Sequence, residues 1–478
     1  MTAPASALRM GTARGRGTLL AAILASGMVF LDTTVVNVAL PRLGAELKAN
    51  VADLQWTVNG YLLMLAAFVL LGGALGDRFG RRRVFLLGVV WFAAASVLCG
   101  LSQGTGWLIV ARFLQGAGGA LLTPGSLSVL QASFHPDDRG RAIGTWSGLS
   151  GVSTALGPLL GGFLIDALSW RSIFFINVPL AVAVVLAALR WVPESRDVAV
   201  SRAGAKRRFD ILGALLGALG LGGVTYALID APARGGRSPA VLASALVGVL
   251  AVVIFVLVER RRGEAAMLPT KLFGSRLFSV LNVFTVVVYA ALSGFTFFLP
   301  IYLQNVVGWS ALLTGLATVP MTLLLLVGSP RAGALSAKIG PRLPLTVGPV
   351  VAAAGLLLLR RIGPGASYWV DVLPGVVLFG AGLTLVVAPL TTSVLAAVAD
   401  RFAGVASGFN NAASRAGGLL AVAALPLLVG LSGTGYEQKG ALTSAFRGAM
   451  LWCAGLLLAG AALAALLIHR PVKGRAPS

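Results

Sequence analysis

Charged residues are scarce in this sequence of 478 residues. Only 11% are Asp, Glu, Lys or Arg, whereas 57% are hydrophobic and the mean hydropathy is +0.89. An average soluble domain carries about 25% charged residues, so a soluble fold of this composition would expose far too much apolar surface. A water-soluble enzyme is therefore excluded. The apolar residues suffice for about a dozen or more membrane-crossing helices of roughly 20 residues each.

Cysteine and histidine are almost absent, with two of each. Cys99 and Cys453 lie far apart in apolar stretches, so we expect packing residues rather than a disulfide framework or a cysteine metal site. His135 and His469 fall in a connection and at the end of the last apolar run, and cannot form a buried metal site. No lysine follows a glycine, which excludes a G-K-[ST] phosphate loop and ATP-driven transport by this chain.

Apolar runs bounded by charge or by Gly and Pro predict fourteen membrane spans. No connection between them is long enough for a soluble catalytic domain. The predicted spans are 17–40, 53–75, 84–102, 106–128, 142–166, 172–192, 211–230, 239–258, 277–300, 312–334, 343–360, 370–394, 404–431 and 446–468.

The excess of basic over acidic residues gives a net charge of +22, which in a soluble protein would indicate a nucleic-acid partner. Here 27 of the 38 Lys and Arg residues lie in the tails and in the even-numbered connections. The positive-inside rule then places both termini in the cytoplasm of a bacterial cell, with the chain in the plasma membrane. The first apolar run is too long for a secretory signal, so we expect an uncleaved first span.

An internal repeat divides the chain into two halves. Residues 73–82 (GALGDRFGRR) recur at 333–342 (GALSAKIGPR), and a second match at a similar offset relates the starts of spans five and thirteen. The predicted fold is all-α, with two six-helix bundles and two inserted central helices. Its segments are a cytoplasmic tail (1–16), a first bundle (17–192), basic connections with the inserted helices (193–276), a second bundle (277–468) and a second cytoplasmic tail (469–478).

Asp32 is the only acidic residue deep within a predicted span. An ionised carboxylate there costs roughly 2.5–3.5 kcal/mol or more, so such a residue indicates a functional site. Thr33, Thr34 and Asn37 make the same stretch polar. We expect Asp32 to bind and release protons; the alternative is a structural carboxylate in a permanent ion pair.

Arg112 in the fourth span is the natural partner of Asp32. At 1.5 Å per residue, Asp32 lies about 12 Å and Arg112 about 9 Å below the same surface, so they meet if the two spans are neighbours. Making and breaking this pair would couple protonation to conformation. Arg415 is the only other cation deep in a span, close to Asn410 and Asn411. A structural role and a transport role are both open for Arg415.

Two further groups of span residues are candidates for function. Glycines at helical spacing in the fifth span allow a neighbouring helix to approach closely, and Pro158 is expected to bend that helix. A plain packing motif is the alternative interpretation. The residues of this first group are Gly148, Gly157, Pro158, Gly161 and Gly162. The second group, the candidates for lining a substrate cavity, comprises Asn37, Gln115, Asn282, Tyr289, Asn410 and Asn411.

Five segments carry motifs: 73–83 (GALGDRFGRRR), 112–116 (RFLQG), 157–162 (GPLLGG), 31–41 (LDTTVVNVALP) and 170–179 (WRSIFFINVP). The first three resemble the cytoplasmic loop signature, the fourth-helix motif and the antiporter motif of the major facilitator superfamily. The other two resemble signatures of its fourteen-helix drug:proton antiporter branch.

This resemblance implies two six-helix bundles that rock about a central cavity. It implies that Arg112 assists proton transfer, that Asp32 contributes to recognition of protons or cationic substrates, and that Asp77 and its basic neighbours latch the cytoplasmic side. The second loop copy departs from the pattern, because Ala337 stands where the first has Asp77. The loop residues concerned are Gly73, Asp77, Arg78, Gly80, Arg81 and Arg82.

The sequence thus predicts a secondary transporter that exports small, largely hydrophobic or cationic drugs or antibiotics in exchange for protons. The alternative is a dedicated exporter of one endogenous metabolite, such as a self-made antibiotic. A membrane-embedded lipid enzyme lacks a catalytic constellation, and a structural or receptor role leaves Asp32 and Arg112 unexplained. We expect no cofactor beyond the proton gradient, no metal, no nucleic-acid partner, and a functional monomer in the lipid bilayer.

Overall fold

The computed structural model describes residues 8–195, 210–262, 268, 270–399 and 402–468, and these are almost entirely α-helical, without a β-strand. The predicted tail 469–478 and most of the basic connection between the sixth and seventh spans lie outside the described residues. The all-α prediction is confirmed.

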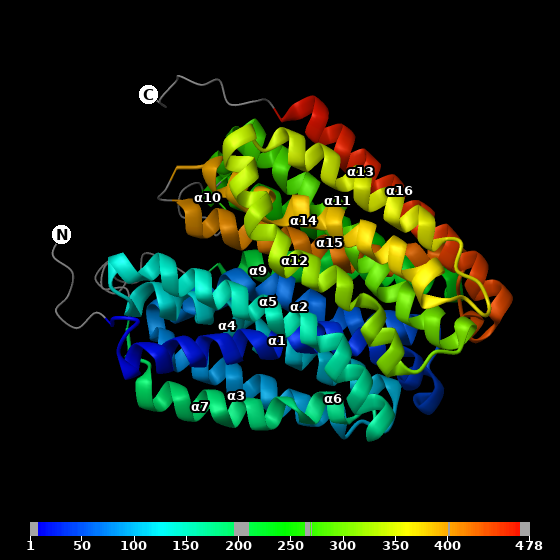
Figure 1. The fold of residues 1–478 in the computed structure, drawn as a ribbon, viewed down its shortest axis with the longest axis horizontal. Coiled ribbons are helices and arrows are strands. Elements are labelled where there is room, and N and C mark those ends of the chain that lie inside the picture. The colour runs from blue at the N-terminus through cyan, green and yellow to red at the C-terminus, as the bar shows by residue number, and fades with distance from the viewer. Residues whose placement is uncertain (1–7, 196–209, 263–267, 269, 400–401, 469–478) are drawn as a thin grey trace.

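The first half of the chain forms one layer of helices, the lower layer in Figure 1. Helix α4 packs against both α2 and α3, and α1 packs against α5 and α7. The helices are α1 (Ala13–Leu47), α2 (Val51–Phe79), α3 (Arg81–Gly100), α4 (Thr105–Ser133), α5 (Pro136–Ala167), α6 (Ser172–Phe175) and α7 (Asn177–Trp191).

The second half forms the upper layer in Figure 1. Helix α11 packs on α15 and α16, and α13 packs on α14 and α16. The helices are α11 (Arg276–Tyr302), α12 (Ala311–Ile339), α13 (Arg342–Leu359), α14 (Leu373–Ala396), α15 (Ala403–Leu428) and α16 (Lys439–Leu467). Within the described residues, the two layers meet chiefly where α5 packs on α12 and α2 packs on α15.

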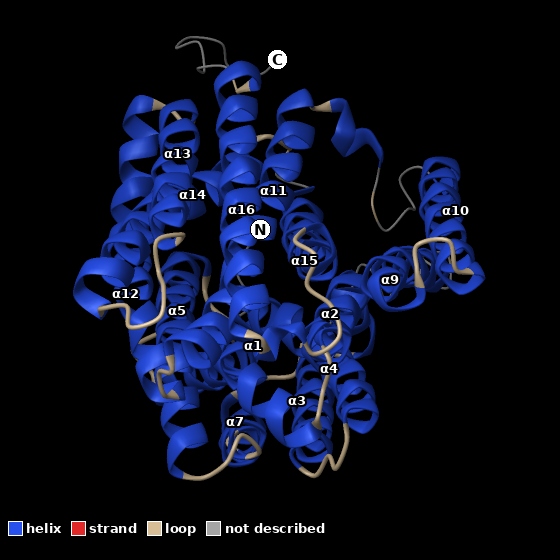
Figure 2. Cartoon of the chain, turned by 90° about the vertical axis from the view of Figure 1, so that its right-hand side faces the viewer, coloured by secondary structure: helices blue, strands red, loops and turns tan. Residues whose placement is uncertain are grey.

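Two helices between the halves lie at one edge of the molecule, as Figure 2 shows: α9 (Ile211–Arg234) and α10 (Pro239–Arg262). Helix α9 packs on α2 and α15, so it touches both halves, whereas α10 packs mainly on α9. Three glycines let α9 and α10 approach closely: a Cβ on Gly223 would lie 2.7 Å from the Ser244 carbonyl oxygen and 2.8 Å from the Gly248 Cα. These are the predicted inserted helices.

Thirteen helical segments in the described chain are long and apolar enough to cross a membrane. Helix α4, which corresponds to the predicted fourth span, is not among these thirteen; it is 29 residues long, packs on α2 and α3 and carries the buried Arg112. The chain therefore has the helices of a multi-pass membrane protein. We call the end of the molecule where α1 ends and α2 begins the distal end.

Several predicted boundaries are wrong by a few residues. Helix α1 begins at Ala13 rather than residue 17, and the predicted sixth span, 172–192, breaks at Ile176 into α6 and α7. The predicted loop 73–83 is nearly all helix, because α2 continues to Phe79 and α3 begins at Arg81. Hydropathy marks where the apolar residues end. A helix can continue beyond that point, because its backbone hydrogen bonds do not depend on apolar side chains.

Both copies of the internal repeat end their helix in the same way. The amide of Gly80 donates to the Gly76 carbonyl at the end of α2, and that of Gly340 donates to the Ser336 carbonyl at the end of α12. Gly80 has φ +110° and Gly340 has φ +87°, values that favour glycine. The repeat in sequence is thus a repeat of one helix-ending geometry.

The tightest helix crossing of the second half gives a prediction about stability. A Cβ on Gly382 of α14 would overlap the backbone of α13 at Gly348 and Ala352, so Gly382→Val forces the helices apart. Overpacking of this kind costs about 1–3 kcal/mol. We expect a lower unfolding midpoint of the purified protein in detergent. Gly455→Ala on α16, where no atom lies within 4 Å of an added Cβ, is the control and should leave the midpoint unchanged.

Candidate functional site

Asp32 and Arg112 form an ion pair inside the first bundle. The Nη1 of Arg112 lies 2.6 Å from the Oδ2 of Asp32, and both side chains are at most 2% exposed. Arg112 also donates through Nε to the Thr57 carbonyl oxygen of α2, at 3.0 Å. The predicted meeting of spans one and four is confirmed. The pair is monodentate, so the remaining oxygen of Asp32 is open to a second donor.

Gln115 supplies that second donor. Its Nε2 donates to the Oδ1 of Asp32 at 2.8 Å, while its Oε1 accepts from the Nη1 of Arg112 at 2.6 Å. The Nε2 also donates to Ser96 on α3, at 2.8 Å, and the amide of Asn177 on α7 donates to the same hydroxyl at 3.3 Å. Gln115, predicted to line a cavity, is fully buried and belongs to the charge network.

Aromatic rings close the network to solvent. The guanidinium carbon of Arg112 lies 4.4 Å from the ring centroid of Tyr61 and 6.0 Å from that of Phe174. A cation over an aromatic face is stabilised by the ring quadrupole, most strongly where water is excluded. One acid thus connects five helices, α1, α2, α3, α4 and α7, through buried hydrogen bonds.

Helix α5 joins this network to the second half. A Cβ on Gly157 would overlap the Thr34 hydroxyl, and one on Gly161 would lie 3.2 Å from the Val35 Cα, so α5 rests on α1 directly after Asp32. Gly148 is different, because nothing lies within 4 Å of an added Cβ there. The predicted close approach along span five therefore holds at its later glycines and not at Gly148.

On its other side, α5 contacts α12 of the second bundle. A Cβ on Gly162 would lie 2.6 Å from the Leu312 Cα, and one on Gly315 would overlap the Pro158 carbonyl oxygen. The carboxylate of Asp166 accepts from the backbone amides of Ala311 and Leu312, at 3.3 and 2.8 Å. The first amides of a helix lack partners within it and carry partial positive charge. Asp166 thus caps a helix of the opposite half.

Side-chain amides hold the two halves together elsewhere at the distal end. Gln55 of α2 donates to the carbonyl oxygens of Val422 and Ala423 of α15, at 2.7 and 2.9 Å. Gln304, directly after α11, donates to the Val38 carbonyl oxygen of α1 at 2.9 Å. These bonds cross between the halves.

Tyr436 adds a contact from the connection between α15 and α16. Its buried hydroxyl donates to the Ala49 carbonyl oxygen at 2.7 Å, and the amide of Val51 donates to the Gly433 carbonyl oxygen at 2.8 Å. Burial, together with the Glu437 carboxylate, raises the pKa of Tyr436 to about 12, so the hydroxyl stays protonated and remains a donor. The distal end is therefore closed.

The predicted latch residues lie at the opposite end. Arg81 pairs with Asp77 one turn earlier, with Nη2 2.8 Å from Oδ1. The Glu194 carboxylate, just after α7, accepts from the backbone amide of Arg82 at 3.1 Å and lies against Gly80, where a Cβ would come within 2.7 Å of Oε1. The contacts of Asp77, Arg81 and Arg82 that the structure records stay within the first half.

The remaining candidates lie on α11 and α15. Asn410 donates to the Oδ1 of Asn282 at 3.1 Å and to Thr285 at 2.7 Å. Tyr289 and Asn411 are partly exposed. Asn37 donates to the Thr33 carbonyl of its own helix at 3.2 Å and is also partly exposed. These residues do not join the Asp32 network.

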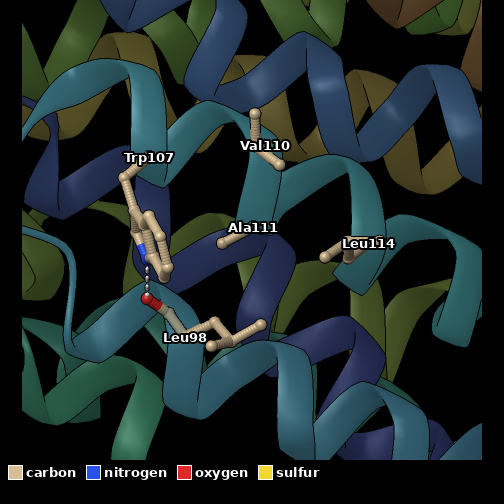
Figure 3. A pocket seen from close by; sticks show the side chains of 5 residues that line it. All are labelled: Leu98, Trp107, Val110, Ala111 and Leu114. Carbon is tan, nitrogen blue, oxygen red and sulfur yellow. Dashed lines mark hydrogen bonds between the residues drawn. The ribbon is translucent and has the colours of Figure 1, made fainter.

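A shallow apolar hollow lies on the far side of α4 (Figure 3). It is lined by Leu98, Trp107, Val110, Ala111 and Leu114, and the indole of Trp107 donates to the Leu98 carbonyl oxygen at 3.0 Å. Trp107 and Val110 are more than half exposed. In a membrane protein such a surface faces lipid, so this hollow is separate from the charge network.

The sequence profile of the Major Facilitator Superfamily matches residues 22–422. The chain belongs to this superfamily. Similar proteins include the tetracenomycin C resistance and export protein of Streptomyces glaucescens (38% identical over 426 residues, covering 89% of this chain and 77% of that protein). The methylenomycin A resistance protein of Bacillus subtilis is 36% identical, covering 87% of this chain and 89% of that protein.

The multidrug resistance protein Stp of Mycobacterium tuberculosis is 35% identical, covering 85% of this chain and 74% of that protein. Among solved structures, a peptide transporter POT mutant bound to sulfate has a TM-score of 0.68 at 16% identity, covering 97% of this chain and 98% of that one. That likeness concerns the fold alone. This member of the Major Facilitator Superfamily is a multi-pass membrane transporter rather than an enzyme.

Sequence reasoning missed several residues of this transporter. Asp166 is an acid at the end of a predicted span, and its cap on α12 depends on helix packing that the sequence does not display. Gln55 carried a usable signal, because a buried amide on an apolar helix must find a partner. Asn177 lies within the motif segment 170–179, but nothing in that motif assigns it a partner, and Ser96 carries no sequence signal.

The cap on α12 predicts how the distal end opens. Asp166→Ala removes two hydrogen bonds between the halves, at about 1 kcal/mol for a lost helix cap. We expect about a fivefold rise in the distal-open population. Double electron–electron resonance between spin labels at exposed Leu168 and Leu428 measures it, since both native cysteines are buried. Asp371→Ala is the control, because among the described residues its carboxylate accepts from the nearby Ser367 amide and makes no bond between the halves; it should change nothing.

The glycine contact between α5 and α12 gives a second prediction. Gly162→Ala places a methyl group against the backbone of α12, so the closed distal end is strained and transport slows. Gly148→Ala on the same helix meets no atom and is the matched control. The measurement is the initial rate of substrate accumulation in everted vesicles, which should fall for Gly162→Ala and stay unchanged for Gly148→Ala. Equal loss of rate in both variants would show that the contact with α12 is unimportant.

Proposed function

We propose that this transporter exports small, largely hydrophobic drugs or antibiotics in exchange for protons, and that Asp32 carries the proton. The observation that carries the proposal is the buried pair of Asp32 and Arg112, together with the bridging amide of Gln115. An ionised carboxylate is costly at this depth, so an acid kept there indicates a function such as proton coupling. An acid that is paired with a single arginine can bind a proton, which neutralises the carboxylate and ends the ion pair.

The energetics of this pair suit a switch. Removing one charge from a buried ion pair costs about 3–5 kcal/mol, because the other charge is left uncompensated. Protonation of Asp32 leaves Arg112 with neutral acceptors only, the Gln115 and Thr57 oxygens. A cost of this size shifts an equilibrium between two arrangements by about two to four orders of magnitude. Protonation can therefore select the conformation in which Arg112 finds other partners or water.

A continuous path of contacts links the acid to the interface between the halves. Thr34 and Val35 follow Asp32 on α1 and pack on Gly157 and Gly161 of α5. Helix α5 packs in turn on α12 through Pro158 and Gly162, and Asp166 caps α12. Because glycine contacts tolerate little displacement, a shift of α1 is passed to α5 and α12 rather than absorbed.

The orientation and location follow from charge. The ends of the chain and the even-numbered connections hold most of the Lys and Arg residues, so we propose that the termini are cytoplasmic and that the closed distal end faces outward. We propose a bacterial plasma membrane as the site and a monomer as the working unit, because the charge network and the bonds between the halves are complete within one chain.

The names of the similar proteins support export of antibiotics. They refer to tetracenomycin C, methylenomycin A and multidrug resistance. A mainly apolar transport path with few polar anchors suits hydrophobic ligands of varied structure. Export of one endogenous antibiotic is the narrower alternative, and a broad compound panel separates the two.

Replacement of Asp32 tests the proposal. In everted vesicles energised with a proton gradient, addition of a substrate should dissipate the gradient through the native transporter. Asp32→Asn removes the titrating group, so we expect at least a tenfold loss of substrate-dependent proton movement, measured with a pH-sensitive dye. Asp230→Asn is the control, because that acid pairs with Arg234 at a helix end and should leave proton movement intact.

Two results would contradict the proposal. One is undiminished proton-coupled export by Asp32→Asn. The other is that no compound of a broad panel of antibiotics and dyes causes the native transporter to dissipate the proton gradient.

A further inference from the structure

Arg415 is a deep cation that no acidic residue of the described chain neutralises. It lies 13 residues before the end of α15, about 20 Å from the distal end of that helix. Among the described residues, no carboxylate lies within 4 Å of its guanidinium group, and its buried Nε has no hydrogen-bond partner. Arg112 in the other half is compensated on several sides. The two arginines are therefore in opposite electrostatic situations.

The helical spacing of α15 shows where Arg415 points. Gly408 and Val422, seven residues before and after it, both contact α2: Gly408 meets Leu70, and the Val422 carbonyl accepts from Gln55. Residues seven apart lie on one stripe of a helix. Arg415 therefore faces the first half rather than lipid. It nevertheless stays partly exposed, so the interface does not fill the space around it.

No acid in the described part of the chain is available to neutralise Arg415. Both oxygens of Asp32 are occupied by Arg112 and Gln115, and the other acidic residues of the sequence lie at the ends of spans or in connections. The deep charges are thus two arginines and one aspartate. An uncompensated cation at this depth is costly and is expected to pair with an anion.

The neighbours of Arg415 suit an anionic ligand with an apolar body. Asn411, one turn earlier on the same stripe, is a partly exposed amide donor, and Arg415 is close enough to the hydroxyl groups of Tyr61 and Tyr289 to interact electrostatically with them. Guanidinium binds carboxylate and similar anions through paired hydrogen bonds. The rest of the stripe is formed by small and apolar residues, among them Gly418.

We propose that Arg415 binds the acidic group of the substrate, so that the exported compounds are hydrophobic organic acids bound as anions. This inference rests on the proposed export function and narrows its substrate class. It departs from the expectation of cationic substrates, since the only deep acid is already paired while a deep cation is not.

Anionic substrates change the charge balance of transport. When an anion leaves the cell and a proton enters, both movements carry positive charge inward, so an inside-negative membrane potential drives both. A neutral substrate exchanged for one proton moves one charge. Export of an acid should therefore depend more steeply on membrane potential than export of its uncharged ester.

Matched acids and esters test the proposal on the full chain. The probes are pyrenebutyric acid and anthracenecarboxylic acid, each with its uncharged methyl ester. Binding to purified protein in detergent is followed by fluorescence anisotropy against empty micelles. We expect the native protein to bind at least one acid tenfold more tightly than its ester. Arg415→Gln should weaken acid binding at least tenfold and leave ester binding unchanged, whereas Arg415→Lys should retain part of the preference.

Arg447→Gln is the control variant, because this residue is exposed on α16. It should keep the full preference for acids. If Arg415→Gln does not fold, the acid-to-ester ratio of the native protein and the potential dependence of export in vesicles decide the question.

The proposal is wrong if the native protein binds no acid of the set, if acids and esters bind equally, or if Arg415→Gln keeps the preference. If esters or cations drive Asp32-dependent proton movement as well as the acids do, that result overturns this inference but leaves proton-coupled export intact. Absence of Asp32-dependent proton movement with every compound would instead overturn the export proposal itself.

Discussion

The buried ion pair between Asp32 and Arg112 is the constraint on which the first bundle depends. Two charges taken out of water are tolerated only when each is compensated, and here Gln115, Thr57 and Tyr61 complete the compensation. Five helices must keep their positions for these contacts to exist together. Anything that changes the charge of Asp32 therefore acts on the bundle as a whole rather than on one side chain.

In the proposed mechanism, glycine contacts pass a change at Asp32 on to the interface between the halves. Glycines of α5 meet the Thr34 and Val35 side chains of α1 and the backbone of α12 at close range, so there is little room for these helices to shift independently. The polar bonds that close the distal end, from Asp166, Gln55 and Gln304, are few. A closure made of a few such bonds can be opened by an energy of the size that the buried pair supplies.

Much of this architecture could be predicted from the sequence. Hydropathy predicts the spans, and the repeat of 73–82 predicts two halves. Charged residues are so rare within the spans that Asp32 and Arg112 can be singled out. Helix ends such as Ala13 and Phe79 could not be predicted closely, because helices continue past the apolar residues. The roles of Gln115 and Asp166 depend on which helices touch, and Gly148 looks identical to Gly162 until the partner helix is in place.

The central claim is that Asp32 changes its protonation state while the protein works. Infrared difference spectroscopy on the purified full chain in lipid, recorded across a pH titration, detects the carbonyl stretch of a protonated carboxyl group in an apolar site. The account predicts a band that appears reversibly on acidification, that is absent from Asp32→Asn and that persists in Asp230→Asn. A spectrum without such a band throughout the pH range in which the protein transports would mean that Asp32 stays ionised beside Arg112, and would contradict the account.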